Sequence, residues 1–365
     1  MAVAFSLDEA RTIAVSSQGF GLNRPTLEQV YSQVCCLQID PLKAVRESHE
    51  IVCLSRGVPL VEAKSLITSR SSIQVFAYPA HAMALLPASF WPWFAFSRRR
   101  MLSKGWRGPE VDDEAIRCVR ALLQERRTIT VKDFAKGTGT GWNRSSLWRI
   151  AAEWLLWTGE AVSTTRNGSY REYALSTNVI PEPLISAEPS DDECFEYLVG
   201  AAINALGIAT LDDIADYFRL RKEVVERALT ATGCPRGIVE GWSEPVWFSR
   251  RAESLVGTKL DDCVAPLSPF DSLVWYRPRL QRLFGKTYKF EAYKKADERV
   301  FGHYFMPVLC GNEIVGRIAP RRKKHHVSIE ACEFDMQLDP TIIDLAFQTL
   351  NEWSEATLFT ALSAE

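Results

Sequence analysis

The chain has 365 residues, of which 47% are apolar and 24% charged, and it carries 43 Lys and Arg against 45 Asp and Glu. This composition is that of a globular protein and excludes the disordered, collagenous and coiled-coil classes. The length predicts two to four domains at roughly 100–200 residues per domain. The most apolar run, 83–96, is interrupted by Pro87 and Pro92 and is shorter than the ~20 residues of a membrane-spanning helix. No secretory signal is readable, so we expect a soluble cytoplasmic protein without a membrane partner.

Cysteines and histidines give no sign of a metal site. The nine cysteines are irregularly spaced, with no Cys-x-x-Cys pair, and the five histidines form no His-Glu-x-x-His motif. We expect reduced, mostly buried thiols and no zinc. The sequence also lacks a phosphate-binding Gly-x-x-x-x-Gly-Lys-Ser/Thr loop and a dinucleotide fingerprint. It therefore predicts a protein that works with neither a metal nor a cofactor.

Two capping boxes predict helix starts near the N-terminus. Residues 6–9 and 26–29 each place a hydroxyl three positions before a Glu or Gln, ahead of an amphipathic segment. The second helix leads into the sequence Leu-Gln-Ile-Asp at 37–40, and Pro41 ends any helix there. We interpret 1–110 as a loose first copy of the repeat that follows.

The middle of the chain contains one pattern twice. Three helices followed by a two-stranded hairpin are typical of a winged helix-turn-helix, and the repetition strengthens the prediction. The first copy predicts helices over 112–124, from Thr130, and from Ser145 or Ser146 to Gly159, then strands over 160–164 and 170–175 that meet at Asn167 and Gly168. The second predicts helices from Asp191 to Gly207, from Thr210 and around 224–229, then strands near 237–240 and 246–248.

After Pro266 the pattern changes to alternating apolar and polar residues. It predicts strands over 288–293, 303–309, 313–318 and 326–334, with a tight turn at Gly311-Asn312 and an amphipathic helix from Pro340. Residues 177–190, with three prolines, are expected to form a short linker.

The predicted fold class is α+β. It consists of three tandem winged helix-turn-helix units and a small C-terminal antiparallel barrel or sheet. The expected domains are 1–110, 111–180, 181–262 and 263–365.

Positive charge is concentrated although the net charge is only −2. Residues 277–324 hold 13 Lys and Arg against four acids, and 98–107 form a second basic cluster. Either cluster alone is more often a solvated surface, but two in a nearly neutral chain favour a polyanionic partner. Arg277, Arg279 and Arg282, on an expected turn into a strand, and Arg321, Arg322 and Lys323, after a strand end, are candidate phosphate contacts.

Gln38-Ile39-Asp40 is the candidate catalytic motif. In an extended segment Gln38 and Asp40 face the same way, while Ile39 points into the core. A carboxylate can stabilise an oxocarbenium-like sugar or accept a proton from water, and an amide can hold that water. The pair would suffice for N-glycosidic cleavage when the leaving base is already cationic. Alternatively, a Gln and an Asp before a proline form only a turn or cap.

Nearly the whole chain resembles the AlkZ-like bacterial DNA glycosylases, and the Gln-x-Asp motif resembles their YcaQ-type subgroup. The segments that carry the resemblance are 37–40, 46–49, 54–56, 267–275, 277–279, 282–285, 307–309 and 316–318.

The resemblance implies three winged helices and a β-barrel around a C-shaped, DNA-sized channel. It also implies a monofunctional enzyme for cationic alkylpurines, chiefly N7-alkylguanine, in nucleoid DNA, and some members unhook interstrand crosslinks. Gln38 and Asp40 match the catalytic motif of the family. Arg46, His49 and Arg56 match family positions expected near DNA, although His49 could equally be a hydrogen-bonded structural residue.

One segment departs from the family pattern. The family has an aromatic-x-His-Glu sequence where this chain has Pro79-Ala80-His81-Ala82. A DNA-contacting role for His81 is therefore less secure, and the substrate preference could differ.

Two functions of different classes fit these features. A glycosylase would act as a monomer that encloses duplex DNA with little sequence preference and strong salt dependence. A non-enzymatic winged-helix regulator would favour one sequence, would usually dimerise on a palindrome, and would tolerate loss of Gln38 or Asp40.

Overall fold

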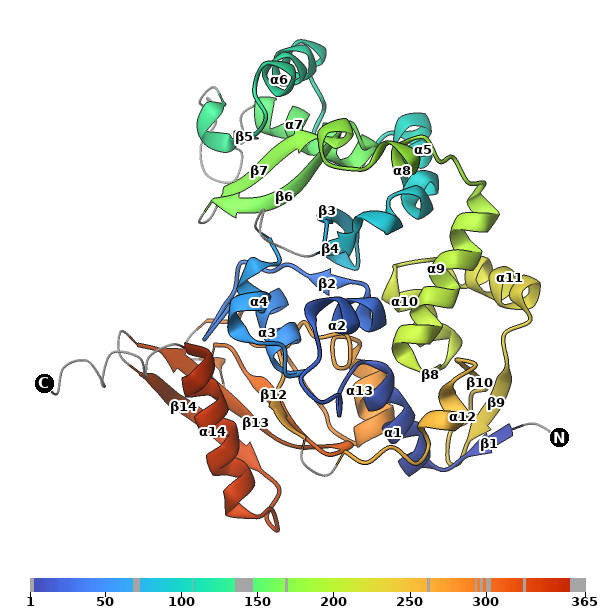
Figure 1. Cartoon of the computed structure of the whole chain (residues 1–365), viewed down its shortest axis with the longest axis vertical. Helices are drawn as coiled ribbons and strands as arrows, with labels where there is room; N and C mark the ends of the chain where they lie inside the picture. Colours follow the sequence, from blue (N-terminus) through green and yellow to red (C-terminus); the bar gives the residue numbers. More distant parts are fainter. Residues whose placement is uncertain are drawn as a thin grey trace, which may run out of the picture. The chain divides into compact units, whose positions relative to one another are not determined.

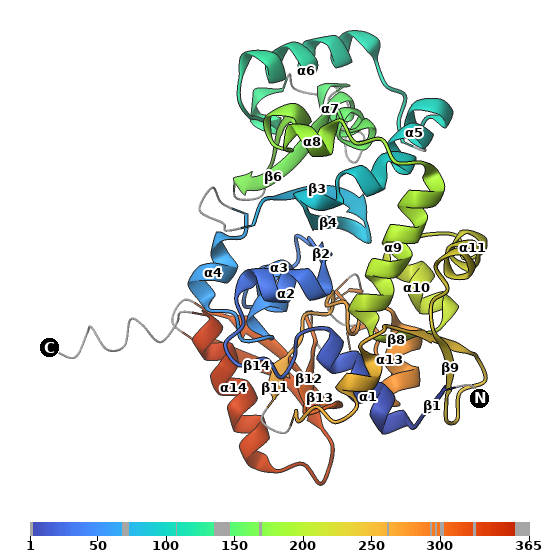
Figure 2. The ribbon, with the colours of Figure 1, turned by 45° about the vertical axis from the view of Figure 1, so that its right-hand side comes forward.

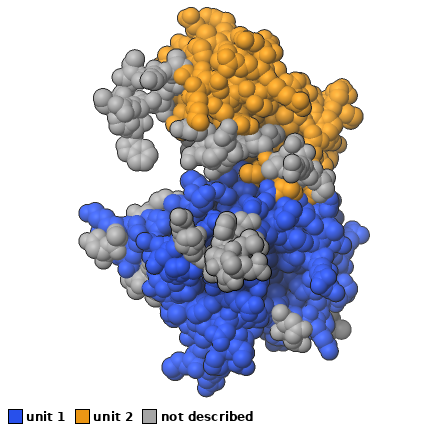
Figure 3. Space-filling view, turned by 60° about the vertical axis from the view of Figure 1, so that its left-hand side comes forward, with its two compact units in different colours: residues 1–64, 199–365 blue, residues 65–198 orange. Residues whose placement is uncertain are grey.

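The computed structural model describes residues 3–67, 73–106, 108–134, 147–167, 170–260, 263–292, 294–295, 298–299, 303–323 and 326–354. These residues form two compact units (Figure 3), unit 1 with residues 1–64 and 199–365, and unit 2 with residues 65–198. Helices and largely antiparallel sheets are combined, so the chain is α+β as predicted. Residues 1–110 contribute to both units.

The N-terminal helices of unit 1 begin where the capping boxes predict. The side chains of Ser6 and Thr26 accept hydrogen bonds from the third backbone amide of each helix. In return, the side chains of Glu9 and Gln29 accept hydrogen bonds from the backbone amides of Ser6 and Thr26. Cys35, with φ of 43°, ends the second helix in the left-handed region. The elements of this region are β1 (Val3–Phe5), α1 (Leu7–Ser17), α2 (Leu27–Val34), β2 (Leu37–Gln38), α3 (Ser48–Leu54) and α4 (Leu60–Ser65).

Unit 2 contains the first predicted repeat. The predicted helix at 112–124 and the two hairpin strands are confirmed, and Thr130 caps a short 3₁₀ helix; Ser145, Ser146 and Gly168 lie outside the described residues. Its strands follow the antiparallel order β4-β3-β6-β7-β5. The elements are β3 (Val75–Ala80), β4 (Ala82–Pro87), η1 (Ala88–Phe90), η2 (Pro92–Phe94), α5 (Ala95–Lys104), α6 (Asp113–Glu125), β5 (Ile129–Thr130), η3 (Val131–Asp133), α7 (Leu147–Thr158), β6 (Ala161–Asn167) and β7 (Tyr170–Leu175).

The expected linker at 177–190 is partly helical. It contains α8 (Glu182–Ile185) and the end of η5 (Ser176–Asn178), and α9 (Asp191–Leu206) follows it.

The second predicted repeat is confirmed as a set of helices and strands, largely in unit 1. A capping box between Thr210 and Asp213 starts its second helix. Its sheet has the order β1-β9-β10-β8, in which β1 from the extreme N-terminus pairs in parallel with β9. The elements are β8 (Ile208–Ala209), α10 (Leu211–Tyr217), α11 (Lys222–Thr232), β9 (Arg236–Val239), β10 (Val246–Phe248) and α12 (Ala252–Leu255).

The C-terminal region is a four-stranded antiparallel sheet of order β11-β12-β13-β14 with two helices. In Figures 1 and 2, α14 lies along this sheet and packs on β11 and β14. The Gly311 turn is confirmed, with φ of 59°. The elements are β11 (Val264–Pro266), α13 (Arg277–Phe284), β12 (Met306–Cys310), β13 (Glu313–Arg322), β14 (Val327–Phe334) and α14 (Pro340–Ser354).

Two predictions for this region are wrong. Residues 277–284 form a helix, α13, instead of a turn into a strand, because Pro278 suits a first helical turn and Leu280, Leu283 and Phe284 form one buried face. No strand is present over 288–292, and residue 293 lies outside the described part of the chain.

Candidate active site

Gln38 and Asp40 lie at the end of β2 in unit 1. Gln38 is half-buried, and Asp40 is 9% exposed. The Oδ1 atom of Asp40 accepts a hydrogen bond of 2.8 Å from the backbone amide of Leu42, which closes an Asx turn across Pro41. This turn fixes the carboxylate directly after the strand. Ile39 is also half-buried, and it is not among the fully buried residues of the core.

The first turn of α3 supports the carbonyl group of Gln38. The Oγ atom of Ser48, which is fully buried, donates a hydrogen bond of 3.0 Å to the Gln38 carbonyl oxygen. The preceding loop carries an ion pair between Lys43 Nζ and Glu47 Oε1 at 2.7 Å. Ser48 thus holds the motif at Gln38, and the Lys43–Glu47 pair links two residues of the loop that follows the motif.

An exposed basic strand end lies beside this loop. The backbone amide of Arg322, the last residue of β13, donates to the carbonyl oxygen of Ala44 at 3.3 Å. Arg321, Arg322 and Lys323 are all exposed. Arg321 also pairs with Glu330 at 2.6 Å. The structure thus brings the loop that follows the predicted catalytic motif into backbone contact with one predicted phosphate-binding cluster.

Arg46, His49 and Arg56 are buried instead of facing solvent. Arg46 is 8% exposed and donates from Nε to the Trp353 carbonyl oxygen at 2.6 Å, which ties it to the end of α14. His49 is 2% exposed within α3. Arg56 forms a bidentate ion pair with Asp271 at 2.7 and 2.9 Å, and both side chains are fully buried. In this structure neighbouring protein groups cover all three side chains, and the expectation that they contact DNA stays a prediction.

The comparisons with known proteins identify the family of the chain. The family described as DNA glycosylase AlkZ-like matches residues 32–350, a span that includes Gln38, Asp40 and the basic strand end. The chain belongs to the AlkZ-like DNA glycosylase family.

A solved structure shows that the fold is shared along the chain. The DNA glycosylase AlkZ of Streptomyces sahachiroi superposes with a TM-score of 0.66 over 97% of this chain and 98% of that chain, at 14% sequence identity. At this identity the likeness concerns the fold, whereas the family match assigns the chain to DNA glycosylases.

In this AlkZ-like chain the arginines of α13 are structural. Arg279 is 1% exposed and donates to Asp213 Oδ2 at 2.9 Å and to the carbonyl oxygens of Ile208 and Leu206. Burial lowers the pKa of the Arg279 guanidinium, and Asp213 opposes that shift. Arg282 pairs with the other oxygen of Asp213 at 2.5 Å.

Arg277 is held in a similar way. It donates to the carbonyl oxygens of Val274 and Pro269 at 2.7 and 2.9 Å, and its guanidinium stacks 4.0 Å from the Tyr288 ring centre. The guanidinium groups of Arg277, Arg279 and Arg282 bind carbonyl and carboxylate groups of the fold, so the structure gives them structural partners, and their predicted phosphate contacts stay predictions.

His81 lies in unit 2, at the turn between β3 and β4, and is 3% exposed. Ala82 follows it with φ of 49°, in the left-handed region. His81 is therefore buried in this structure, and its expected DNA-contacting role stays a prediction.

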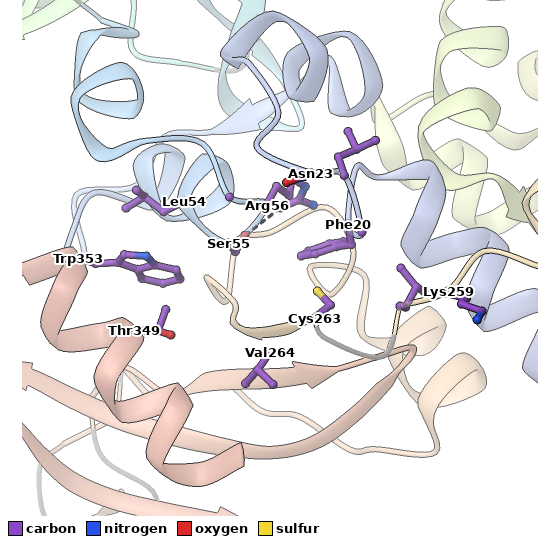
Figure 4. A pocket seen from close by; sticks show the side chains of 14 residues that line it. Phe20, Asn23, Leu54, Ser55, Arg56, Lys259, Cys263, Val264, Thr349 and Trp353 are labelled. Atoms are coloured by element: carbon purple, nitrogen blue, oxygen red, sulfur yellow. Dashed lines mark hydrogen bonds between the residues drawn. The ribbon is translucent and has the colours of Figure 1, made fainter. Parts of the chain in front are cut away.

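A cavity of about 500 Å³ lies elsewhere in unit 1 (Figure 4). Arg56 stacks over Phe20 at 4.3 Å in its wall, and Cys263 and Trp353 also line it. Neither Gln38 nor Asp40 is among its lining residues, so this cavity is separate from the candidate active site.

The described residues contain no group of three or more His, Cys, Asp or Glu suited to a metal ion. All nine cysteines are free thiols, of which four are buried. Within the same described part of the chain, no helix is long and apolar enough to cross a membrane.

Proposed function

We propose that this AlkZ-like glycosylase hydrolyses the N-glycosidic bond of cationic alkylpurines in duplex DNA, that N7-alkylguanine is its principal substrate, and that it also unhooks interstrand crosslinks. The observation that supports this proposal is the Asp40 carboxylate, fixed by the Leu42 amide in a loop that contacts the exposed basic end of β13. The proposal is supported because a carboxylate suits a sugar cation and the exposed cations at the end of β13 suit the phosphates of the same duplex.

The proposed reaction needs no general acid. An N7-alkylguanine carries a positive charge, and the electron pair of the breaking C1′–N9 bond neutralises it. Asp40 stabilises the sugar cation and accepts a proton from the attacking water, while the amide of Gln38 orients that water. The oxygen of the water bonds to C1′, and the products are the free neutral base and an abasic site. No lysine Schiff base is formed, so we propose a monofunctional enzyme.

Arg321, Arg322 and Lys323 are the proposed phosphate contacts, since all three are exposed at the strand end whose backbone contacts the loop after Asp40. We further propose that one monomer is sufficient for activity.

The test is base release from a duplex with one N7-methylguanine and from a nitrogen-mustard crosslinked duplex, with abasic sites cleaved by mild alkali. Wild type is compared with Asp40→Asn and Gln38→Ala, and DNA affinity is measured for each. We expect Asp40→Asn to reduce base release by about 100-fold or more, as removal of a group that stabilises transition-state charge does, with DNA affinity retained.

Two outcomes would contradict the proposal. Tight DNA binding by wild type without base release from either duplex would leave a DNA-binding role alone. Borohydride trapping of a covalent enzyme–DNA complex would contradict the monofunctional mechanism.

A further inference from the structure

A chain of three buried hydroxyl groups leads to the Gln38 carbonyl. Ser48 Oγ lies 3.0 Å from that carbonyl oxygen, Ser268 Oγ lies 3.3 Å from Ser48 Oγ, and Tyr304 Oη lies 3.2 Å from Ser268 Oγ. Ser48 and Ser268 are fully buried, and Tyr304 is 2% exposed. Three separate segments thus meet at the backbone of the catalytic motif: the start of α3, the loop after β11 and the approach to β12.

The direction of every bond follows from the single proton on each hydroxyl. A carbonyl oxygen can only accept, so the proton of Ser48 is committed to Gln38. Ser268 must then donate to Ser48, and Tyr304 must donate to Ser268. The backbone amide of Phe270 donates to Ser268 Oγ at 3.2 Å, which holds this middle link. All the hydrogen bonds between the hydroxyl groups therefore donate in the same direction, from Tyr304 toward Gln38. Successive hydrogen bonds in one direction polarise each other.

Tyr304 is suited to be the terminal donor. Burial raises the pKa of its phenol, the bond to Ser268 partly opposes the shift, and Tyr288, Asp40 and Glu47 raise the pKa further. The hydroxyl therefore keeps its proton throughout the working pH range.

We propose that Tyr304, Ser268 and Ser48 are positioning residues that fix the Gln38 peptide group, and through it the side chains of Gln38 and Asp40, for the glycosylase reaction. This inference rests on the proposed function of that motif. The Asx turn fixes the motif after Asp40, and the hydroxyl chain fixes it at Gln38, so loss of either allows the reacting groups to shift relative to the sugar.

The first test compares Tyr304→Phe and Ser48→Ala, which each remove one hydroxyl, with Ser272→Ala as the matched control. Ser272 is in the same loop as Ser268 and is 3% exposed, but its hydroxyl donates to the Gln18 side chain and takes no part in the hydroxyl chain from Tyr304 to Gln38. Under single-turnover conditions we expect base release to fall about tenfold in Ser48→Ala and several-fold in Tyr304→Phe, with DNA Kd unchanged, whereas Ser272→Ala remains within about twofold of wild type.

The second test uses the order in which the hydroxyl groups are linked to Gln38. Ser268 reaches Gln38 only through Ser48, so the double variant Ser48→Ala/Ser268→Ala should be no slower than Ser48→Ala alone. Two independent structural contacts would instead multiply their separate losses. Urea unfolding of each variant identifies any variant that fails to fold. If a serine variant does not fold, the proposal is tested by Tyr304→Phe, which removes only the hydroxyl group and keeps the ring.

A third readout does not depend on activity. The amide nitrogen of Ile39 shares a peptide group with the Gln38 carbonyl, so its chemical shift reports the hydrogen bond from Ser48. We expect this signal to move in Ser48→Ala and Tyr304→Phe and to stay unchanged in Ser272→Ala. If the Ile39 signal does not move in any of the three variants, the proposed chain of hydrogen bonds from Tyr304 to Gln38 is wrong.

The two proposals fail in different ways. If wild type is active and Ser48→Ala and Tyr304→Phe release base at the wild-type rate, the positioning role is wrong and the proposed function stands. If wild type releases no base while the Ile39 signal moves as expected, the proposed function is wrong, and the linked hydroxyl groups have only a structural role.

Discussion

Asp216, near the end of α10, has a carboxyl group whose proton affinity is strongly changed by folding. Its side chain is 8% exposed and pairs with Arg219 at 2.5 Å. Burial raises the pKa of Asp216 to about 6; the charge of Arg219 opposes this shift and that of Asp213 adds to it. In the unfolded chain the same carboxyl titrates near its ordinary pKa of about 3.9. The folded state therefore binds more protons between about pH 4 and pH 6, so the stability from this residue falls as the pH rises through that window.

We predict that Asp216→Asn raises the free energy of unfolding at pH 7. The gain is at most about 3 kcal/mol, since each tenfold change in proton affinity corresponds to 1.36 kcal/mol, and it should disappear near pH 4, where the native carboxyl is already protonated. Urea unfolding at pH 4, 5, 6 and 7 measures the difference between the two proteins. A difference that is the same at every pH would show that the Asp216 carboxyl titrates normally.

The Arg56–Asp271 ion pair joins two segments that are distant in sequence, the turn after α3 and the loop before α13. We predict that Asp271→Asn lowers the free energy of unfolding by about 3 kcal/mol, because it leaves the buried Arg56 cation without its counter-charge. The control is Glu313→Gln, which breaks the Arg11–Glu313 pair of the same 2.7 Å length at a site where Glu313 is 59% exposed. An exposed pair contributes about 1 kcal/mol or less, so similar losses in both variants would contradict a structural role for Arg56.

Among helices and strands, the sequence predicts those features that depend on interactions between residues close in the chain. The helix starts at Ser6, Thr26 and Thr210 depend on side chains three residues away, and all three are confirmed. The pairing of β1 with β9 joins the extreme N-terminus to the second repeat, and no local pattern encodes it. In α13 the alternating arginines suggested a strand, but the buried stripe on one face and the shared partner Asp213 favour a helix.

The candidate site was predictable to a similar extent. A short motif identified Gln38 and Asp40, whereas counting charges could not tell an arginine that faces solvent from one that is enclosed by carbonyl groups. Ser48 and Ser268 lie inside segments that carry the family resemblance, but Tyr304 had no sequence signal, because only folding brings it next to Ser268.

For the whole molecule, local charge matters more than the net charge of −2. Most arginines of the basic C-terminal segment that were expected to bind phosphates are used inside the fold, and the end of β13 keeps an exposed basic group beside the Asp40 loop. Phosphate binding by that group releases counterions, so its contribution should be visible in the salt dependence of DNA affinity.

We predict that Arg322→Ala/Lys323→Ala weakens binding to undamaged and alkylated duplexes alike. Each lost phosphate contact should reduce the slope of log K against log salt concentration by about 1, so the double variant should lose about 2. The matched control, Arg250→Ala/Lys259→Ala, also removes two exposed cations from unit 1, but from positions outside the Asp40 loop and β13. Fluorescence anisotropy from 50 to 300 mM salt would give both slopes. If the two variants have equal slopes, binding depends on net charge and the end of β13 is not a specific phosphate contact; if only the first slope falls, the duplex lies over the loop that carries Asp40.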